Sequence, residues 1–185
     1  PSSRAWICPT YHPSYISRMN EDKTLVQIWK EHLQRAIDLA DGPEAAPLDT
    51  AALQKQVEVI THPDRMRSRL HKLLAKKGLV AFDYETTGLK PDAAEQRIHS
   101  VSFCFEGEET FAGVVDASVH PVLSRVLRRP ELRKIASNLK FEERWTRVKL
   151  GHGVEGWEWD TMLASHVLDN RPGITSIKFQ AYVHL

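Results

Sequence analysis

The sequence predicts an α/β protein whose mixed sheet is flanked by helices. From residue 53 onwards, short apolar runs alternate with amphipathic helical patterns. The run from Leu79 to Phe82 is continuously apolar, as expected for a central strand that is buried on both faces. Two further runs, at 101–105 and 110–115, flank the polar turn at 106–109. This arrangement predicts an antiparallel meander.

The other elements are predicted from local patterns in chain order. Residues 57–60 predict the first strand, and the stretch from Thr61 to Asp64 is typical of a capping box with proline in the first turn. The helix that follows, over 63–77, has one basic face, which we expect to be solvated, with phosphate contact as the alternative: Arg65, Arg67, Arg69, Lys72, Lys76 and Lys77. The remaining expected elements are a strand at 5–8, a helix at 23–39, a helix at 119–128, a strand at 134–136, helices at 141–149 and 161–168, and a helix that begins within 174–185.

Composition excludes several classes of protein. The 185 residues are 42% hydrophobic and 26% charged, which is ordinary for a soluble globular protein. No apolar run approaches the roughly 20 residues that a membrane span needs, so we expect no membrane partner. The net charge of +1 gives no evidence for nucleic-acid binding through bulk charge. Cys8 and Cys104 are too few for a disulfide framework, which favours a reducing, cytoplasmic compartment.

A single change in composition divides the chain. Residues 41–49 contain two prolines and one glycine without a large apolar cluster, so they are typical of a linker. We predict that residues 1–40 are the C-terminal end of one domain, 41–52 a linker, and 53–185 the N-terminal part of a second domain. Forty residues bury too little apolar surface for a core of their own. We therefore expect the chain to be a piece of a longer protein.

The strongest chemical signal is a pair of carboxylates at the end of the buried strand. Asp83 and Glu85 lie two residues apart, so their side chains share a face of the strand. Their Cα atoms should be roughly 6.6 Å apart. Because paired metal ions in hydrolases lie about 3.5–4 Å apart, this spacing fits ligands of two ions. The alternative is a solvated or salt-bridged pair. Gly88 then supplies a turn that a substrate backbone can approach.

Two later motifs extend this pattern. Asn138-Leu-Lys-Phe-Glu142 opens a helix, and Trp159-Asp-Thr-Met-Leu163 follows it. Together with Asp83 and Glu85, they resemble the 3′–5′ proofreading exonuclease domain of family-A DNA polymerases, which belongs to the DEDD exonucleases of ribonuclease-H-like fold. The resemblance covers about residues 57–185. Glu142 stands where the family usually has aspartate, and the family's last motif, Tyr-x3-Asp or His-x4-Asp, is absent.

The resemblance implies a site with two Mg²⁺ or Mn²⁺ ions that hydrolyses the terminal 3′ phosphodiester of single-stranded or frayed DNA. It assigns Asp83 to both ions, Glu85 to the inner ion and Glu142 to the outer ion. Asp160 is expected to be a helix cap. With the fourth carboxylate missing, we expect little activity from residues 1–185 alone. The substrate-binding residues that the resemblance implies are Thr86, Leu89, Asn138 and Phe141. The alternative for Leu89 is packing within its loop, and for Phe141 a place in the core is the favoured interpretation.

At the other end, the stretch from Pro9 to Arg18 resembles the last motif of uracil-DNA glycosylases. The resemblance implies that His12 stabilises the oxyanion on the uracil ring, whereas the alternative is a plain His-Pro turn. The two resemblances together imply a phage or bacterial DNA replication or repair protein, with a polymerase domain or replication proteins as partners. Three alternatives stay open: an inactive nucleic-acid-binding module, a ribonuclease of the same fold, and a protein dominated by its glycosylase part.

Overall fold

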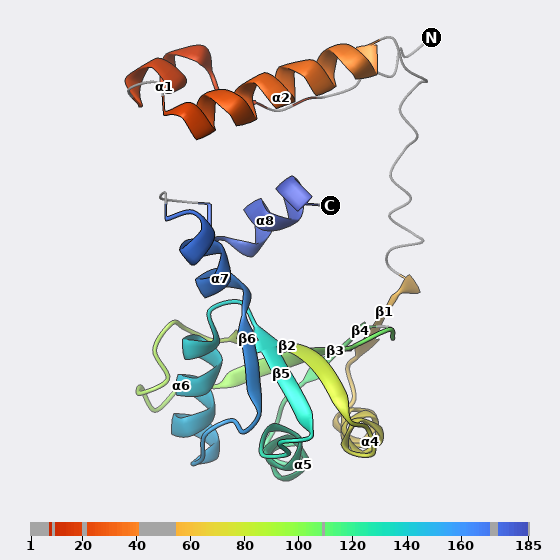
Figure 1. Cartoon of the computed structure of the whole chain (residues 1–185). Helices are drawn as coiled ribbons and strands as arrows, with labels where there is room; N and C mark the ends of the chain where they lie inside the picture. Colours follow the sequence, from red (N-terminus) through yellow and green to blue (C-terminus); the bar gives the residue numbers. More distant parts are fainter. Residues whose placement is uncertain are drawn as a thin grey trace. The chain divides into compact units, whose positions relative to one another are not determined.

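The computed structural model describes residue 8 and residues 10–19, 22–40, 55–108, 110–170 and 174–184. The chain divides into two compact units, Pro1–Thr50 and Ala51–Leu185. Each unit is described by itself, and Figure 1 shows the elements of both.

The first unit contains two helices, α1 (Pro13–Arg18) and α2 (Lys23–Ala40). Ile16 of α1 and Leu25 of α2 are its buried apolar residues among those described. The helix predicted at 23–39 is confirmed. The strand predicted at 5–8 lies outside the described residues except for Cys8, which is not in a strand.

The second unit is built on one six-stranded mixed sheet with the strand order β1-β4-β3-β2-β5-β6. The β2–β3 and β3–β4 pairs are antiparallel, and the β1–β4, β2–β5 and β5–β6 pairs are parallel. The strands are β1 (Val57–Ile60), β2 (Gly78–Thr86), β3 (Ile98–Phe105), β4 (Thr110–Val114), β5 (Leu132–Ala136) and β6 (Trp157–Asp160). The helices are α4 (Pro63–Leu74), α5 (His120–Leu127), α6 (Leu139–Leu150), α7 (Thr161–Leu168) and α8 (Ile177–His184). The predicted α/β class with a mixed sheet is therefore confirmed.

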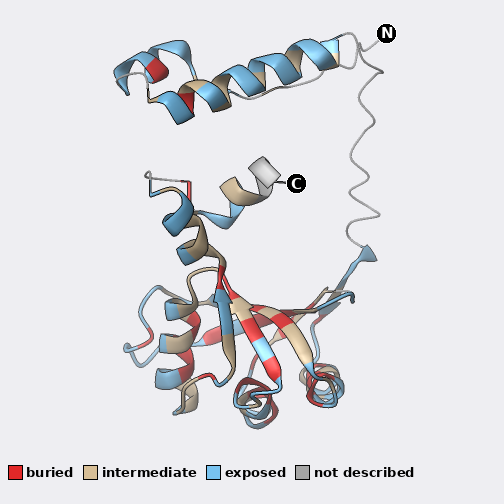
Figure 2. Ribbon diagram, in the orientation of Figure 1, coloured by how far each residue is buried: buried red, intermediate tan, exposed pale blue. Residues whose placement is uncertain are grey.

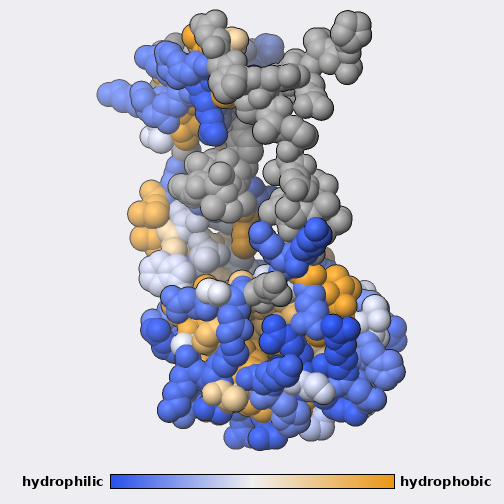
Figure 3. Space-filling view, turned by 90° about the vertical axis from the view of Figure 1, so that its right-hand side faces the viewer, coloured by the Kyte–Doolittle hydropathy of each residue, from blue (hydrophilic) through white to orange (hydrophobic). Residues whose placement is uncertain are grey.

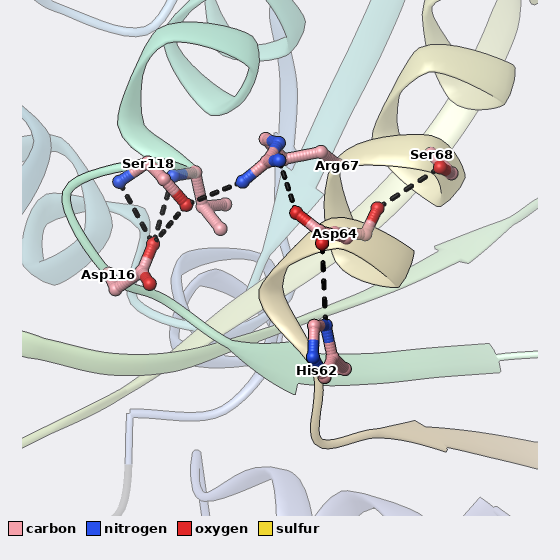
Figure 4. Close-up of polar contacts among 7 residues, drawn as sticks. His62, Asp64, Arg67, Ser68, Asp116 and Ser118 are labelled. Atoms are coloured by element: carbon pink, nitrogen blue, oxygen red, sulfur yellow. Dashed lines mark hydrogen bonds and ion pairs between the residues drawn. The ribbon is translucent and has the colours of Figure 1, made fainter.

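Helix α4 corrects two details of the prediction. Its N-cap is His62, and no side chain accepts a hydrogen bond there, so Thr61 and Asp64 do not form the expected capping box. The reason is that Pro63 occupies the first helical position, which leaves Thr61 outside the helix. Asp64 instead forms ion pairs with His62 and Arg67 (Figure 4). The helix ends at Leu74, three residues before the predicted end.

The basic face of α4 is largely occupied by contacts inside the unit. Arg65 and Arg69 form ion pairs with Glu58 at 2.9 and 3.0 Å. Nη1 of Arg67 donates to the hydroxyl of Ser118 at 2.7 Å, which fastens α4 to the segment before α5 (Figure 4). These contacts account for the arginines without a phosphate.

The core lies on one face of the sheet, where aromatic rings of neighbouring strands stack. The ring of Phe82 lies 5.6 Å from that of Phe103, which lies 5.5 Å from that of Phe111. The Arg69 guanidinium of α4 covers Phe111 at 4.7 Å, so α4 packs on this face. Figure 2 shows the buried residues concentrated along the central strands and on the inner sides of the helices. Residues of β2 that point to the other face are less buried, Asp83 among them.

The surface of the second unit is mostly polar. Figure 3 shows hydrophilic side chains over most of the visible face, with smaller hydrophobic patches among them. Exposed apolar side chains include Trp159 of β6 and Val167 and Leu168 of α7. Among the described helices, none combines the length and the apolar character that crossing a bilayer demands.

Candidate active site

Strand β2 presents the predicted carboxylates on one face. Asp83 and Glu85 are exposed, and they alternate with Phe82 and Tyr84, which are buried in the core. The alternation follows from the two-residue period of a strand and confirms that the two carboxylates share a face. Pairing of β2 with β5 ends at Ala81. Asp83 therefore lies beyond the last residue that pairs with β5. At this end of the sheet, the chain leaves β5 and enters α6.

Helix α6 brings the third carboxylate to the same place. Glu142 is 1% exposed, and its carboxyl group lies within hydrogen-bonding reach of Asp83. Its Oε2 is buried and has no hydrogen-bond partner among the described residues. Two ionised carboxylates carry only acceptors, so a shared proton or a bound cation is needed to satisfy both. The structure thus brings together Asp83 and Glu142, which are 59 positions apart in the sequence.

The pKa values of both groups reflect this crowding. Burial raises the pKa of Glu142 to about 8, and the negative charges of Asp83 and Asp160 add to the effect. Partial desolvation also raises the pKa of Asp83, as does the charge of Glu85, while the hydrogen bond to Glu142 opposes them. A cation at this position would relieve the repulsion and favour the ionised forms of these groups.

A buried hydrogen-bond chain fixes α6 against β2. The hydroxyl groups of Tyr84 and Thr146 are hydrogen-bonded at 3.0 Å, and Thr146 Oγ1 donates to the carbonyl of Glu142 at 2.7 Å. Tyr84 lies between the two carboxylates of β2 in the sequence, so the strand that carries them is linked directly to the turn that carries Glu142.

The neighbouring Glu143 has a different task. Its carboxylate accepts hydrogen bonds from the Trp157 indole at 3.0 Å and from the Val154 backbone at 2.9 Å, and it pairs with Arg147. Burial opposes its ionisation, but these hydrogen bonds outweigh that effect and lower its pKa. Glu143 therefore anchors α6 to the segment before β6, and Glu142 is the carboxylate that faces Asp83.

Asp160 is confirmed as a helix cap, because its Oδ1 accepts hydrogen bonds from the backbone of Met162 at 2.9 Å and Leu163 at 3.1 Å. It also accepts from the backbone of Asn138 at 3.0 Å and Leu139 at 2.9 Å, at the start of α6. One buried carboxylate thus holds the N-termini of two helices.

The residues expected to bind substrate lie at the same end of the sheet but differ in exposure. Leu89 is 86% exposed on the loop after β2, so it does not pack in the unit. Thr86 donates its hydroxyl hydrogen bond to the carbonyl of Gly88 at 2.7 Å. Phe141 is half-buried and packs against the core, with its ring 6.0 Å from that of Trp145.

Asn138 contributes through its backbone. It is the N-cap position of α6 but its side chain makes no capping hydrogen bond. Its φ of 69° lies in the left-handed region, which asparagine tolerates better than most residues. This conformation turns the chain from β5 into α6 and aims the backbone N–H groups of residues 138 and 139 at Asp160.

The carboxylates fit divalent cations by their chemistry. Carboxylate oxygens are the ligands that Mg²⁺ prefers, and the unpartnered Oε2 of Glu142 beside Asp83 is such a donor. Within the described residues, no three acidic, histidine or cysteine side chains come close enough together to hold an ion by themselves. Mg²⁺ characteristically binds through one or two carboxylates and keeps several waters, so a partial cage matches its requirements.

His12 in the first unit is the N-cap residue of α1. Its Nδ1 accepts from the backbone of Ser14 at 3.2 Å and contacts the Ser14 hydroxyl at 2.7 Å. In a neutral imidazole this leaves the proton on Nε2. The ring is exposed.

Sequence reasoning missed Tyr84 and Thr146 as supports of the site, and it missed the contact of Asp160 with α6. The signal for Tyr84 was its place between Asp83 and Glu85, since a polar hydroxyl on the buried face of a strand needs a partner. No comparable local signal exists for the α6 contact of Asp160, which depends on the pairing of β5 with β6.

Comparison with solved structures supports the fold. A nuclease solved in its apo form is 19% identical, with a TM-score of 0.55, and the match covers 70% of this chain and 60% of that one. NrnC from Brucella melitensis, bound to pGG, is 18% identical with a TM-score of 0.54 over the same shares. RNase D from Escherichia coli, an exoribonuclease involved in structured RNA processing, is 17% identical with a TM-score of 0.53, covering 69% of this chain and 33% of that one. The chain therefore has the ribonuclease-H-like exonuclease fold and spans about 60% or less of these relatives.

The sequence itself identifies the family. No curated protein matches the chain. The model of the 3′–5′ exonuclease family matches residues 57–179, which include all three carboxylates and the helices and strands that position them. Because this match covers most of the chain, the protein belongs to the 3′–5′ exonuclease family.

Proposed function

We propose that this chain carries a metal-dependent 3′–5′ exonuclease site that hydrolyses terminal phosphodiesters by a two-metal mechanism. The observation that supports it best is the buried carboxyl group of Glu142, which faces Asp83 with one oxygen unpartnered. Asp83, Glu85 and Glu142 would hold Mg²⁺ or Mn²⁺. When bound, such ions activate water and stabilise the charge that develops on a phosphate.

The remaining residues prepare the site without direct chemistry. Tyr84 and Thr146 keep Glu142 opposite Asp83, so the ligands are in place before substrate arrives. The exposed Leu89 side chain is available to contact the terminal base, and the loop that carries it follows directly from the carboxylate strand. Thr86, Asn138 and Phe141 complete the proposed path of the nucleic-acid substrate.

The proposed substrate is the 3′ end of single-stranded or frayed DNA, because unpaired ends can enter a shallow groove and stack on apolar side chains. RNA is the main rival, since RNase D of Escherichia coli is an exoribonuclease. DNA and RNA single strands of the same sequence, labelled at the 5′ end, distinguish the two. Faster shortening of the DNA strand supports the proposal, and faster shortening of the RNA strand overturns this part of it.

The metal-dependent site has a sharper test in a pair of adjacent variants. Glu142→Gln removes a proposed ligand, whereas Glu143→Gln changes the next residue in the same way at a side chain that contacts Val154 and Trp157. In a chain that also carries the fourth carboxylate of the family, Glu142→Gln and Asp83→Ala should slow 3′–5′ shortening at least 100-fold, comparable to the loss of a major catalytic group. Glu143→Gln should retain activity wherever it is folded. Wild-type rates for Glu142→Gln would contradict the proposal, and an inactive wild type that binds single strands would favour a binding module.

The wider role follows from the same resemblance. We infer that the protein acts in DNA replication or repair in the cytoplasm of a bacterium or a phage-infected host, beside a polymerase domain or replication proteins. The test measures the rate of shortening of frayed primer ends and of unrelated single strands, with and without a polymerase. Faster shortening of the primer ends, and a further increase with polymerase, would support the inference. Equal activity on unrelated single strands with no effect of polymerase would contradict it.

For the first unit we propose a glycosylase-like role of His12. The support is its tautomer, because an Nε2–H on an exposed ring can donate to a uracil oxygen. Uracil excision from DNA by the intact protein, compared with His12→Ala, is the test. Equal excision by both proteins, or none by either, would remove the glycosylase role.

A further inference from the structure

Asp160 joins two helices through one buried carboxylate, and we propose that it is a positioning residue for Glu142. The proposal rests on the proposed function, because it concerns a ligand of that site. Asp160 is 7% exposed and accepts four backbone hydrogen bonds, of which two come from α7 and two from the start of α6. A residue that served only as the cap of α7 would need only the first two.

The two oxygens of Asp160 have different partners. Oδ1 accepts from Asn138, Met162 and Leu163, whereas Oδ2 accepts from Leu139. Both reach α6 because β5 and β6 are parallel neighbours and Ala136 pairs with Asp160. The residues that follow Ala136 therefore pass directly beside the carboxylate.

The link from Asp160 to Glu142 is short. Glu142 lies three residues after Leu139, or about 4.5 Å along the helix axis at 1.5 Å per residue. A helix whose first turn loses two of its hydrogen-bond acceptors frays from that end, because its first four N–H groups have no partner within the helix. The turn that would fray carries the carboxylate that must face Asp83.

Small displacements matter at this place. Ligand oxygens of Mg²⁺ lie at 2.0–2.1 Å, so the ion tolerates little movement of a carboxylate. The Tyr84–Thr146 contact fixes α6 one turn after Glu142, and Asp160 fixes it one turn before. Glu142 is thus held from both sides, and the loss of Asp160 would release one of them.

The experiment compares Asp160→Ser with Asp160→Asn. Serine is itself a good N-cap, so it should keep α7 capped while its single hydroxyl cannot replace Oδ2 at Leu139. Asparagine keeps the size of aspartate but replaces one acceptor with a donor. The matched control is Asp116→Ala, because Asp116 accepts backbone hydrogen bonds from Ser118 and Val119 before α5 (Figure 4). That variant removes a carboxylate that also accepts backbone hydrogen bonds before a helix, at a position distant in the sequence from the proposed metal ligands.

The readout is Mn²⁺ affinity by calorimetry, below the unfolding transition of every variant as seen by circular dichroism. Supporting groups of a metal site typically change metal affinity 10–100-fold. Asp160→Ser and Asp160→Asn should weaken Mn²⁺ binding about tenfold or more, whereas Asp116→Ala should leave it unchanged. If Asp116→Ala raises the Mn²⁺ dissociation constant as much as the Asp160 variants do, the proposal is overturned, because general destabilisation would then explain both effects.

Two comparisons separate this inference from the proposed function. If wild type and Glu142→Gln bind Mn²⁺ equally, the metal site itself is wrong. If Glu142→Gln loses binding while both Asp160 variants bind as wild type does, only the positioning role is overturned. Amide hydrogen exchange gives a second measure, since the N–H of Leu139 should exchange faster in Asp160→Ser while that of Leu163 stays protected.

Discussion

Glu142 combines two features that a soluble protein normally avoids in one side chain, namely burial and a carboxylate neighbour. Its pKa is raised to about 8 from an ordinary value of 4.5, first by burial and then by nearby negative charge. Between these two pH values the native state holds a proton that the unfolded state has released. The proton therefore links the stability of the unit to pH.

The sign of this linkage gives a prediction. The contribution of Glu142 to stability is fully present below about pH 4.5 and is lost as the pH rises through about 8. In metal-free buffer, the free energy of unfolding of wild type should therefore fall over this range more steeply than that of Glu142→Gln, which cannot ionise. Chemical denaturation at several pH values measures both slopes.

The adjacent glutamate is the control for this measurement. Hydrogen bonds lower the pKa of Glu143 despite partial burial, so its contribution is present at neutral pH and is lost as the pH falls. Glu143→Gln should reduce stability near neutral pH without flattening the decline toward pH 8. Parallel slopes for wild type and Glu142→Gln would show that Glu142 is ionised in the native state throughout.

At this scale, sequence reasoning worked where the information was local. The same-face arrangement of Asp83 and Glu85 follows from strand periodicity, and it is confirmed. The structure places the carboxyl group of Glu142 beside Asp83. The role of Glu142 as a metal ligand stays a prediction. The second task of Asp160 could not be predicted, because it depends on which strand lies beside β5.

Among the connections between elements, the turn before β6 is tightly constrained at Gly156. Gly156 has a φ of 76°, and a Cβ atom built on it would lie 2.8 Å from the carbonyl oxygen of Pro130. Its own carbonyl accepts a hydrogen bond from the backbone of Lys134 at 2.7 Å. Glycine is therefore required there both by the backbone conformation and by the close approach of another chain segment.

Gly156→Ala should lower the free energy of unfolding by about 3 kcal/mol, because positive φ and a backbone clash add together. The matched control is Gly107→Ala, which has a similar φ of 74° but open space around its Cβ position. That variant should lose only about 1 kcal/mol. Urea denaturation measures both values, and equal losses would show that the clash with Pro130 is relieved by a small shift.

Element types were predicted better than element ends. The limits of β1 and α7 match the predicted ranges, since proline, aspartate and apolar spacing mark them. The start of α4 was misread because Thr61 and Asp64 have the spacing of a capping box, whereas Pro63 makes His62 the cap. The basic face of α4 was expected to be solvated. In the structure, two of its arginines instead form ion pairs with Glu58 of β1.

For the molecule as a whole, the division into two compact units suggests independent folding. We predict that residues 53–185 alone unfold at the same temperature as the complete chain and bind Mn²⁺ with the same affinity. The reason is that the buried core of the sheet and the carboxylates all lie after residue 55. Calorimetry of both proteins tests this.

Residues 1–40 alone provide the complementary measurement. Two helices with two buried apolar residues among those described bury little surface, so we expect no cooperative unfolding transition from them. A clearly lower unfolding temperature for residues 53–185 than for the complete chain would mean that the first unit supports the second.

The strand order of the sheet marks the limit of prediction at this scale. The meander of β2, β3 and β4 was predictable because the three strands follow one another along the chain, antiparallel pairing is local, and only four residues separate β3 from β4. The parallel placement of β1 beside β4 was not, because α4, β2 and β3 intervene in the sequence. Only packing of the complete sheet decides which strand lies at each edge.

The buried amine of Lys134 can be modified only while the sheet is still open. Its side chain is fully buried, its ammonium group donates to the backbone carbonyls of Arg129 and Glu155, and burial lowers its pKa to about 8. In the folded chain this burial shields the amine from acylating agents. An acyl group on Lys134 would therefore record that a reagent or enzyme met the chain before β5 and β6 had joined, and by abolishing the ammonium donors it would hinder their joining afterwards.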